Sequence, residues 1–371
     1  MILKNLKLMN FRNYKGLFLE FNEKINLIIG KNGQGKTNLV ESIYMLSIGK
    51  SFRTNKDKEL IKFGENNLYI DARIYRDDET KEIEVLIDNK NKGIKVNKIS
   101  IIKISELLGN FNVVVFSPED LKLVKDGPKE RRSFIDKEIS QLIPKYYNNL
   151  QRYRKTLFQR NKLLKNFSID INLLEVYDEE LAKYGSYIYI TRRDFVKKLS
   201  DISKKFHKEL TGNKEELSLI YKTQIDLNDS DDYNSVYQKL KSKLFESREH
   251  DIYNKITRYG IHKDDIEIYI DDIDVRLYGS QGQQRTASIS LKLSEIELIK
   301  NEVGEYPVLI LDDVFSELDE YRQKLLVEKL NDIQIFITTA DISHKAIFRD
   351  VEATVFNVKE GMIDKIENGG R

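Results

Sequence analysis

The first third of the chain carries the apolar patterns of β-strands. Some runs alternate apolar and polar residues, which is typical of a sheet with one buried face, and others are apolar throughout. A helix is predicted at 38–48, between an apolar strand and a series of shorter strands. The pattern therefore predicts a mixed α/β fold with an antiparallel meander after its first helix. The strands are predicted at residues 2–8, 16–21, 25–29, 68–75, 82–88, 93–98 and 111–116.

Helical periodicity replaces the strand pattern after residue 120. The segment 129–164 predicts two helices, the second opened by Pro144, because proline is favoured in the first turn of a helix. Residues 181–210 carry an apolar stripe with spacings of three and four, which predicts one helix about 40 Å long at 1.5 Å per residue. A further helix is predicted at 235–258.

Strand patterns return toward the C-terminus, together with one more helix at 283–300. We therefore expect an α/β head made of residues 1–120 and 255–371, with residues 121–254 inserted as a mainly helical domain. The late strands are predicted at 266–270, 274–277, 308–311, 335–338 and 353–358.

The composition excludes several classes of protein. The chain has 371 residues, of which 40% are hydrophobic and 33% charged, and this suits a globular protein of two domains. No apolar run approaches the ~18 residues of a membrane span. With no cysteine, disulfides and thiolate zinc sites are excluded, and we expect a reducing, cytoplasmic location. The four histidines have no metal-ligand spacing.

Residues 30–37 form a complete phosphate-binding motif, G-x-x-x-x-G-K-T, between a predicted strand and a predicted helix. Its glycines allow backbone N–H groups to turn toward phosphate oxygens, and the helix N-terminus adds further N–H groups. Lys36 is expected at the β- and γ-phosphates and Thr37 at Mg²⁺. The motif predicts a nucleotide site, assigned to ATP with Mg²⁺, rather than a chance glycine-rich turn. Its residues are Gly30, Lys31, Asn32, Gly33, Gln34, Gly35, Lys36, Thr37 and Asn38.

An acidic pair follows the apolar strand 308–311. Asp312 is the candidate to hold Mg²⁺ with Thr37, and Asp313 stands where a general base or water-positioning group is needed. Taken alone, the pair is also compatible with a solvated turn. The segment 316–319 that follows resembles the D-loop of ABC-type ATPases, and this makes Asp319 a further nucleotide-site candidate.

A second anion-binding segment is predicted where the helix 283–300 begins. Ser280, Gly282 and Gln283 stand at the helix N-terminus, where N–H groups favour a phosphate. One chain cannot bring this segment and its own phosphate-binding loop to the same γ-phosphate. In ABC-type ATPases the equivalent signature meets the nucleotide of the facing subunit, so we expect an ATP-dependent, head-to-head homodimer. A glycine- and glutamine-rich helix cap without this role is the alternative.

Taken together, these motifs resemble the RecF family of bacterial recombination mediators over nearly the whole chain. The segment 10–14, N-F-R-N-Y, resembles the family's N-terminal motif, and the resemblance implies that Arg12 reaches a nucleotide phosphate. Further similar stretches are Pro118-Glu119, Gly127-Pro128, Arg131-Arg132, Phe134-Ile135-Asp136, Gly260-Ile261-His262-Lys263-Asp264-Asp265, Leu311-Asp312-Asp313 and Ser316-Glu317-Leu318-Asp319 with Arg322.

The resemblance implies an SMC-like ABC ATPase head, ATP and Mg²⁺ as cofactors, and DNA as a partner, both as duplex and at single-strand/duplex junctions. It also implies RecR as a protein partner, with RecO and RecA engaged indirectly. Asp313 replaces the usual, longer catalytic Glu, which suggests slow hydrolysis. The segment 338–341 offers no switch histidine, and residues 117–120 occupy the place of a Q-loop glutamine. Asp126, Ile261 and Lys263 also depart from the family pattern.

The segment 122–165 is strongly basic, with 13 Lys/Arg against 4 Asp/Glu, although the whole chain has a net charge of only +2. Basic residues that alternate with aromatic ones predict salt-sensitive DNA binding without sequence preference. A solvated helix face with tyrosines packed inward is the alternative, and Arg131 and Arg132 are equally compatible with a structural role. The DNA-contact candidates are Arg131, Arg132, Arg152, Arg154, Lys155 and Arg160.

The sequence therefore predicts an ATP-dependent DNA-binding protein of recombinational repair and replication restart, with weak, DNA-stimulated ATPase activity. Lys36, Asp312 and Asp313 are the predicted catalytic residues. Two alternatives from other classes remain at this point. One is the ATPase subunit of an ABC transporter, which would share both phosphate motifs. The other is a nucleotide-gated scaffold with negligible turnover.

Overall fold

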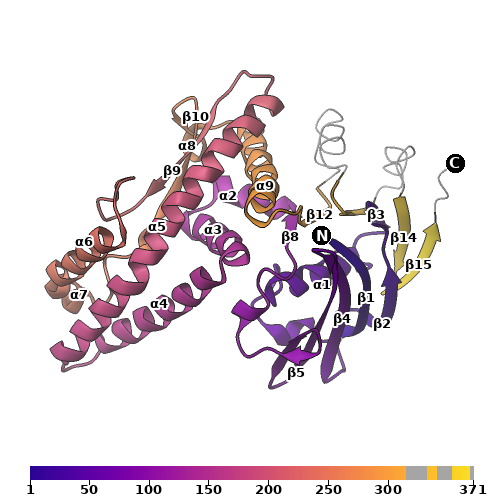
Figure 1. Cartoon of the computed structure of the whole chain (residues 1–371), viewed down its shortest axis with the longest axis horizontal. Helices are drawn as coiled ribbons and strands as arrows, with labels where there is room; N and C mark the ends of the chain where they lie inside the picture. The colour runs from indigo at the N-terminus through magenta and orange to yellow at the C-terminus, as the bar shows by residue number, and fades with distance from the viewer. Residues whose placement is uncertain (315–331, 341–352, 368–371) are drawn as a thin grey trace. The chain divides into compact units, whose positions relative to one another are not determined.

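The protein is represented by a computed structural model that describes residues 1–314, 332–340 and 353–367 (Figure 1). The chain divides into two compact units. The head unit comprises residues 1–120 and 299–371, and the helical unit comprises residues 121–298. The return to the head, predicted at residue 255, therefore differs from the structure, in which residues 255–298 belong to the helical unit.

In its described residues, the head unit contains an antiparallel sheet of six strands in the order β2-β1-β4-β5-β6-β7. Long β-hairpins form this sheet, and its apolar residues alternate with exposed ones, as expected for a sheet with one buried face. The strands are β1 Ile2–Phe11, β2 Tyr14–Glu20, β4 Asn67–Arg76, β5 Glu79–Asp88, β6 Lys92–Val96 and β7 Ile99–Ser100.

The second sheet of the described head residues has the order β15-β14-β3-β13-β12-β8. Its strands from β14 to β8 are parallel, and β15 pairs antiparallel with β14. β3 and β12 are buried at every position, which explains why their sequences are apolar except for Asn26 and the terminal Asp312. The strands are β3 Ile25–Ile29, β8 Val113–Phe116, β12 Val308–Asp312, β13 Ile335–Thr339, β14 Ala353–Lys359 and β15 Met362–Glu367.

Helix α1, Lys36–Ile48, contacts strands of both sheets. Apolar residues cover most of its circumference, because a helix that packs on two sides has little need of a polar face. The helix joins both sheets in one hydrophobic core and so fixes the direction of its N-terminus. The short 3₁₀ helices near this core are η1 Asp57–Leu60, η2 Ile104–Glu106 and η3 Pro118–Leu121.

The helical unit is built around the long helix α5, Ile171–Leu210, which extends about 60 Å at 1.5 Å per residue (Figure 1). The helix begins ten residues before the predicted start at 181, because the Asp170 side chain caps it by accepting from the backbone N–H of Leu173. The other helices are α2 Lys122–Lys125, α3 Pro128–Leu142, α4 Pro144–Leu163, α6 Tyr233–Glu246, α7 Arg248–Asn254, η4 Ile261–Lys263, α8 Val275–Tyr278 and α9 Gln281–Val303, of which residues 299–303 belong to the head unit.

A small antiparallel sheet explains why residues 255–298 belong to the helical unit. β10, Asp265–Ile270, pairs with β9, Leu217–Lys222, and with β11, Ile273–Asp274. The sequence did not predict β9, and it predicted a strand at 274–277. In the structure most of that segment is α8, because the Asp274 side chain accepts from the N–H groups of residues 276 and 277 and starts a helical turn.

Candidate functional site

The phosphate-binding loop connects β3 with α1 in the head unit, and its glycines are required by close contacts. A Cβ atom on Gly30 would lie 2.4 Å from the carbonyl oxygen of Val358. Gly35 has a φ of 119°, and a Cβ atom there would lie 2.6 Å from Nδ2 of Asn13. Both positions therefore exclude larger residues, so the loop backbone comes close to its neighbours without side chains between them.

The N-terminus of α1 has the form of an anion site. Gly35 is its N-cap and supplies no side-chain acceptor to the N–H groups of the first turn. Such groups are available to phosphate oxygens and carry the positive end of the helix dipole. The residues at this position therefore fit a bound phosphate, in agreement with the motif.

Lys36 is buried above the loop that precedes it. Its Nζ donates to the carbonyl oxygen of Gly30 at 2.9 Å and to Oδ1 of Asn32 at 3.3 Å. The same atom lies 4.0 Å from Oδ1 of Asp313. The loop thus holds an ammonium group beside its own turn, with the second acid of the pair at the edge of ion-pair distance.

Thr37 and Asp312 meet although they are 275 positions apart in the chain. Oγ1 of Thr37 donates to Oδ1 of Asp312 at 3.0 Å, and Oγ1 of Thr338 donates to the same oxygen at 2.7 Å. The contact forms because β13 lies between β3 and β12, so their parallel carboxyl ends meet at one edge of the sheet. A hydroxyl and a carboxylate oxygen are ligands that Mg²⁺ accepts, and the pair fits such an ion.

Burial raises the pKa of the Asp312 carboxyl above its usual value, while hydrogen bonds from Thr338 and Thr37 act in the opposite direction. The charged carboxylate is therefore unfavourable where it lies, and a cation at this position would relieve that cost. Asp313 follows with a positive φ of 54°, and its N–H donates to Oγ1 of Thr338 at 3.0 Å. Thr338 thus positions both acids, a role that the sequence did not reveal.

The segment 10–14 packs directly against the phosphate-binding loop. Nδ2 of Asn13 donates to the carbonyl oxygen of Gln34 at 2.8 Å, and the Tyr14 hydroxyl donates to that of Gly35 at 3.0 Å. Nδ2 of Asn38 donates to Oδ1 of Asn13 at 2.9 Å. The N-terminal motif is therefore part of the candidate site, as the resemblance implies.

Arg12 is oriented by a carboxylate of α1 that the sequence did not single out. Its guanidinium donates to both carboxylate oxygens of the fully buried Glu41, at 2.9 and 2.7 Å, and to the carbonyl oxygen of Glu59 at 2.8 Å. Arg53 lies 3.5 Å from the same carboxylate and donates to Oδ1 of Asn38 at 2.8 Å. A buried acid thus gathers two guanidinium groups beside the first turns of α1.

The second predicted anion segment lies in the helical unit. Ser280 and Gln283 form a reciprocal capping box: the N–H of Ser280 donates to Oε1 of Gln283 at 2.9 Å, and the N–H of Gln283 donates to Oγ of Ser280 at 3.2 Å. Gly282 accepts at its carbonyl oxygen from the Thr286 hydroxyl. Ser280 and Gly282 are exposed, whereas Gln283 is half-buried. Asp319 and the rest of the segment 316–319 lie outside the described residues.

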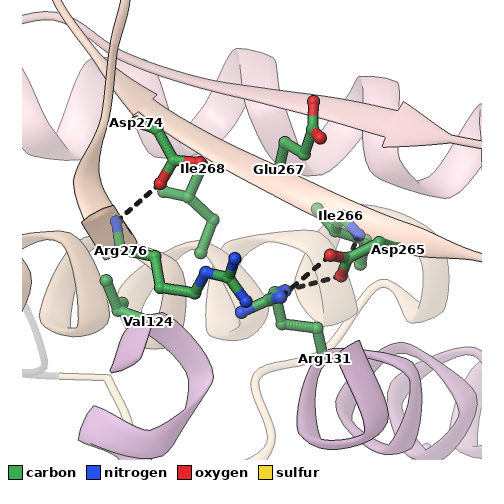
Figure 2. Close-up of a pocket in the computed structure, with 8 residues that line it drawn as sticks. All are labelled: Val124, Arg131, Asp265, Ile266, Glu267, Ile268, Asp274 and Arg276. Carbon is green, nitrogen blue, oxygen red and sulfur yellow. Dashed lines mark hydrogen bonds and ion pairs between the residues drawn. The ribbon is translucent and has the colours of Figure 1, made fainter. Parts of the chain in front are cut away.

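The six DNA-contact candidates do not share one surface. Arg131 is buried, and its guanidinium makes two bonds to the carboxylate of Asp265, at 2.7 and 2.9 Å. Figure 2 shows this pair in a pocket of the helical unit, with Arg276 alongside. Arg160 is completely buried between Asp178 and Asp251. Burial therefore argues against DNA contacts for Arg131 and Arg160, whose acid partners lie far away in the sequence.

The other four candidates are more accessible. Arg132 donates to the carbonyl oxygen of Asp264 at 2.5 Å, and Arg154 pairs with Asp136 at 2.9 Å. Arg152 and Lys155 are exposed on α4. Within the described residues, Arg152 and Lys155 are thus the two candidates that are exposed and have no bond to a protein oxygen to give up to a polyanion.

The fold and the site together define a P-loop ATPase head: a parallel sheet, a phosphate-binding loop after one strand, and an acid at the end of another. Residues 2–363 match the family model of the RecF/RecN/SMC N terminal domain. The chain is 64% identical over 370 residues to the DNA replication and repair protein RecF of Clostridioides difficile (strain 630), covering 100% of both chains. It is 47% identical to the same protein of Alkaliphilus oremlandii (strain OhILAs), covering 98% of this chain and 100% of the relative. The chain belongs to the RecF family.

Solved structures agree with this assignment. The recombination mediator protein RecF in complex with ATP, from the RecFOR pathway, is 42% identical, with a TM-score of 0.92 and coverage of 98% of this chain and 97% of that one. The Smc head domain from Pyrococcus furiosus, at 16% identity, has a TM-score of 0.56 over 99% of this chain and 96% of that one, which supports the fold alone. The predicted fold class, an ABC/SMC-type ATPase head with an inserted helical part, is confirmed. In the described part of the chain, no helix is long and apolar enough to cross a membrane.

Proposed function

We propose that the chain is an ATP-dependent DNA-binding protein of recombinational repair and replication restart. Family membership supports a role in DNA repair, and the name of one solved relative includes bound ATP. The contact that carries the proposal for ATP is the 3.0 Å hydrogen bond between Thr37 and Asp312. It joins the phosphate-binding loop to an acid on another strand of the same sheet, which is the arrangement that a nucleotide with its cation requires. Neither observation favours the ABC-transporter alternative.

Each candidate site residue of the head unit has a distinct role in this proposal. The loop N–H groups and Lys36 hold the β- and γ-phosphates, and Arg12 adds a positive charge near them. Thr37 and Asp312 hold Mg²⁺, which would neutralise charge on the phosphates during hydrolysis. Asp313 orients a water molecule and accepts its proton at a carboxylate oxygen. Because this carboxylate is one methylene shorter than that of a glutamate, we expect slow turnover.

Assembly of two copies follows from the second anion segment. Ser280, Gly282 and Gln283 of one copy would meet the nucleotide held by the other, with Asp319 close by, so that ATP joins two heads. The dimer would hold DNA at single-strand gaps and release it after hydrolysis, which DNA would stimulate weakly. RecR would bind the complex, and RecO and RecA would act through it.

Three measurements test the proposal. Equilibrium binding of ATP should be lost in Lys36→Ala, because the loop then lacks its ammonium group. Sedimentation should show wild-type dimers with ATP and monomers without it, whereas Ser280→Arg should bind ATP but stay monomeric. If ATP leaves the wild type monomeric, the shared-nucleotide dimer is wrong. Fluorescence anisotropy with a gapped duplex then tests whether ATP strengthens DNA binding.

A further inference from the structure

The second anion segment, at the start of α9, is connected to the end of α5 through side chains that no sequence motif indicates. Nε2 of Gln283 donates to Oε1 of Glu215 at 3.0 Å, and Glu215 lies between the end of α5 and the start of β9. The other oxygen of this carboxylate lies 3.3 Å from Nε2 of His207, which is completely buried on α5. Glu215 therefore joins the half-buried cap of α9 to the interior of the helical unit.

The hydrogen bonds around His207 have defined directions. The Ser290 hydroxyl on α9 donates to the carbonyl oxygen of Thr286 at 2.8 Å, so its oxygen accepts from Nδ1 of His207 at 3.0 Å. The other ring nitrogen, Nε2, faces a carboxylate oxygen, and this contact is favourable only with a proton between the two atoms. His207 is therefore bound to α9 on one side and holds the Glu215 carboxylate on the other.

The Gln283 amide is held at both its oxygen and its nitrogen. Nε2 donates to Glu215, and Oε1 accepts from the N–H of Ser280 at 2.9 Å. The backbone N–H of Gln283 in turn donates to Oγ of Ser280 at 3.2 Å. An oxygen that accepts in this way still carries its own hydrogen, which a phosphate oxygen can accept. The orientation of the Ser280 hydroxyl therefore depends on Gln283 and, one bond further away, on Glu215.

The charges of this connection suit a segment that receives an anion. An isolated carboxylate behind the cap of α9 would repel a phosphate. The proton between Glu215 and His207 reduces this repulsion, because it leaves the pair without net charge. The neighbouring Glu216 pairs instead with Lys204 and Lys208. Two consecutive acids thus have different partners, one at the cap of α9 and the other on lysines of α5.

We propose that Glu215 and His207 are positioning residues for the second anion segment. Together they hold Gln283, and through it the Ser280 hydroxyl, in the orientation that receives the γ-phosphate bound by the other copy. The inference rests on the proposed ATP-dependent dimer and adds to it two residues that act only through the cap of α9. An ordinary helix cap, in which Glu215 contributes to stability alone, is the competing explanation.

The experiment measures dimerisation of the full chain by sedimentation with saturating ATPγS and Mg²⁺. Glu215→Ala should weaken dimerisation about tenfold, because it removes a hydrogen bond to a charged group that holds the cap. ATP binding to the monomer should change less than about twofold, since the phosphate-binding loop is distant in the chain and keeps its own contacts. A residue that only stabilises the fold would not separate dimerisation from ATP binding in this way.

Two further variants serve as matched controls. Glu215→Gln should restore most of the lost dimerisation, because its amide oxygen can accept from Gln283 while its N–H group donates to Nε2 of a neutral His207. Glu216→Ala, at the next position of the same connection, should dimerise like the wild type, since its carboxylate pairs with lysines of α5. Each variant should still unfold in one cooperative thermal transition.

A double-mutant cycle tests whether Glu215 acts through Gln283. Gln283→Ala alone should weaken dimerisation, and adding Glu215→Ala should weaken it no further, because the amide that Glu215 holds is already absent. By the same reasoning, His207→Leu should weaken dimerisation of the wild type but not of Glu215→Ala. Losses that add in either pair would show that the two residues act independently, and they would overturn the positioning role.

The remaining outcomes separate this inference from the proposed function. If ATPγS joins wild-type copies and Glu215→Ala dimerises equally well, the positioning role is wrong and the proposed function stands. If Glu215→Gln is as weak as Glu215→Ala, the hydrogen-bonded connection is wrong. If ATPγS leaves the wild type monomeric, the shared-nucleotide dimer fails and the positioning role fails with it.

Discussion

The head unit and the helical unit each hold charged groups at buried positions, but different parts of the chain supply the binding groups. In the head unit the site is the phosphate-binding loop. In the helical unit it is the charged interior, where Arg160 and Arg192 are buried beside carboxylates. The loop uses eight consecutive residues, and much of its chemistry comes from backbone N–H groups. In the helical unit, the buried Arg192 reaches Asp136 and Asp264, which are 56 and 72 positions away in the chain.

The difference explains which of the two could be recognised from the sequence. A backbone site leaves a fixed spacing of glycines, lysine and threonine, because the turn itself requires them. A side-chain site leaves only basic and acidic residues scattered along helices, and the same composition occurs on solvated faces. Arg160 and Arg152 show this: they are eight positions apart on α4, yet one is fully buried and the other exposed.

The largest expected effect comes from removing the buried cation. In Arg160→Met, Asp251 loses its guanidinium partner at 2.8 Å, and Asp178 loses one of its two guanidinium partners among the described residues and keeps Arg248. We expect the free energy of unfolding to fall by ~3–5 kcal/mol, because a buried carboxylate is left without compensation. Chemical denaturation measures this loss.

Arg152→Met on the same helix is the matched control and should cost less than ~0.5 kcal/mol, since its side chain is exposed. If both substitutions lowered the free energy of unfolding equally, the burial of Arg160 would not explain its contribution to stability. Asp251→Asn added to Arg160→Met should recover part of the lost stability, because it removes the uncompensated charge.

The next effect tests the head unit, where a buried charge serves function instead of stability. Asp312→Asn should slow ATP hydrolysis about 100-fold, or ~2.7 kcal/mol of activation free energy, because the amide holds Mg²⁺ poorly. The melting temperature should not fall, since burial already disfavours the carboxylate and the amide oxygen can still accept from Thr37 and Thr338. Phosphate release and thermal unfolding are measured together.

Asp364→Asn, at an exposed position of the same unit, is the control and should change neither quantity. If Asp312→Asn releases phosphate at the wild-type rate, Asp312 has no catalytic role and a nucleotide-gated scaffold becomes the better description. A large fall in melting temperature would instead assign Asp312 to the fold.

The fold was predictable where a segment carries its own pattern. β3 and β12 are apolar at all but one position each, and Pro144 marks the start of α4, so these elements lie where the sequence placed them. β9 was missed because its only described strand partner, β10, begins more than forty residues later. The pairing of those two strands also keeps residues 255–298 in the helical unit. No local sequence pattern predicts this pairing.

The candidate site likewise contains residues that the sequence predicted and residues that only the structure revealed. The motif located Lys36 and Thr37, and the apolar strand located Asp312. No sequence pattern selects Glu41 or Thr338, because each acts through a contact that only the folded chain creates. The basic composition of 122–165 suggested DNA contacts but could not separate the arginines that are paired from those that are exposed.

The smallest effect concerns two neighbouring groups in the charged interior that respond to pH in opposite directions. Burial lowers the pKa of His262 to about 4, and burial raises the pKa of Asp264 to about 6. Unfolded His262 binds a proton below about pH 6.5, so acidification from pH 7 to pH 5 destabilises the fold by ~2 kcal/mol through this residue. Asp264 is protonated more readily in the folded state, so acidification over the same interval stabilises the fold by ~1 kcal/mol through Asp264.

His262→Gln should therefore reverse the sign of this local pH response. The glutamine amide can replace the contacts to the Tyr153 hydroxyl and the carbonyl oxygen of Thr257, both at 3.1 Å, but it takes up no proton. Urea unfolding at pH 7 and pH 5 should show that the variant gains ~2 kcal/mol relative to the wild type on acidification. His250→Gln, at an exposed position of α7, should behave like the wild type. If His262→Gln keeps the wild-type pH response, His262 is already protonated in the folded protein near pH 5, and the interior of the helical unit tolerates charge as readily as the phosphate-binding site does.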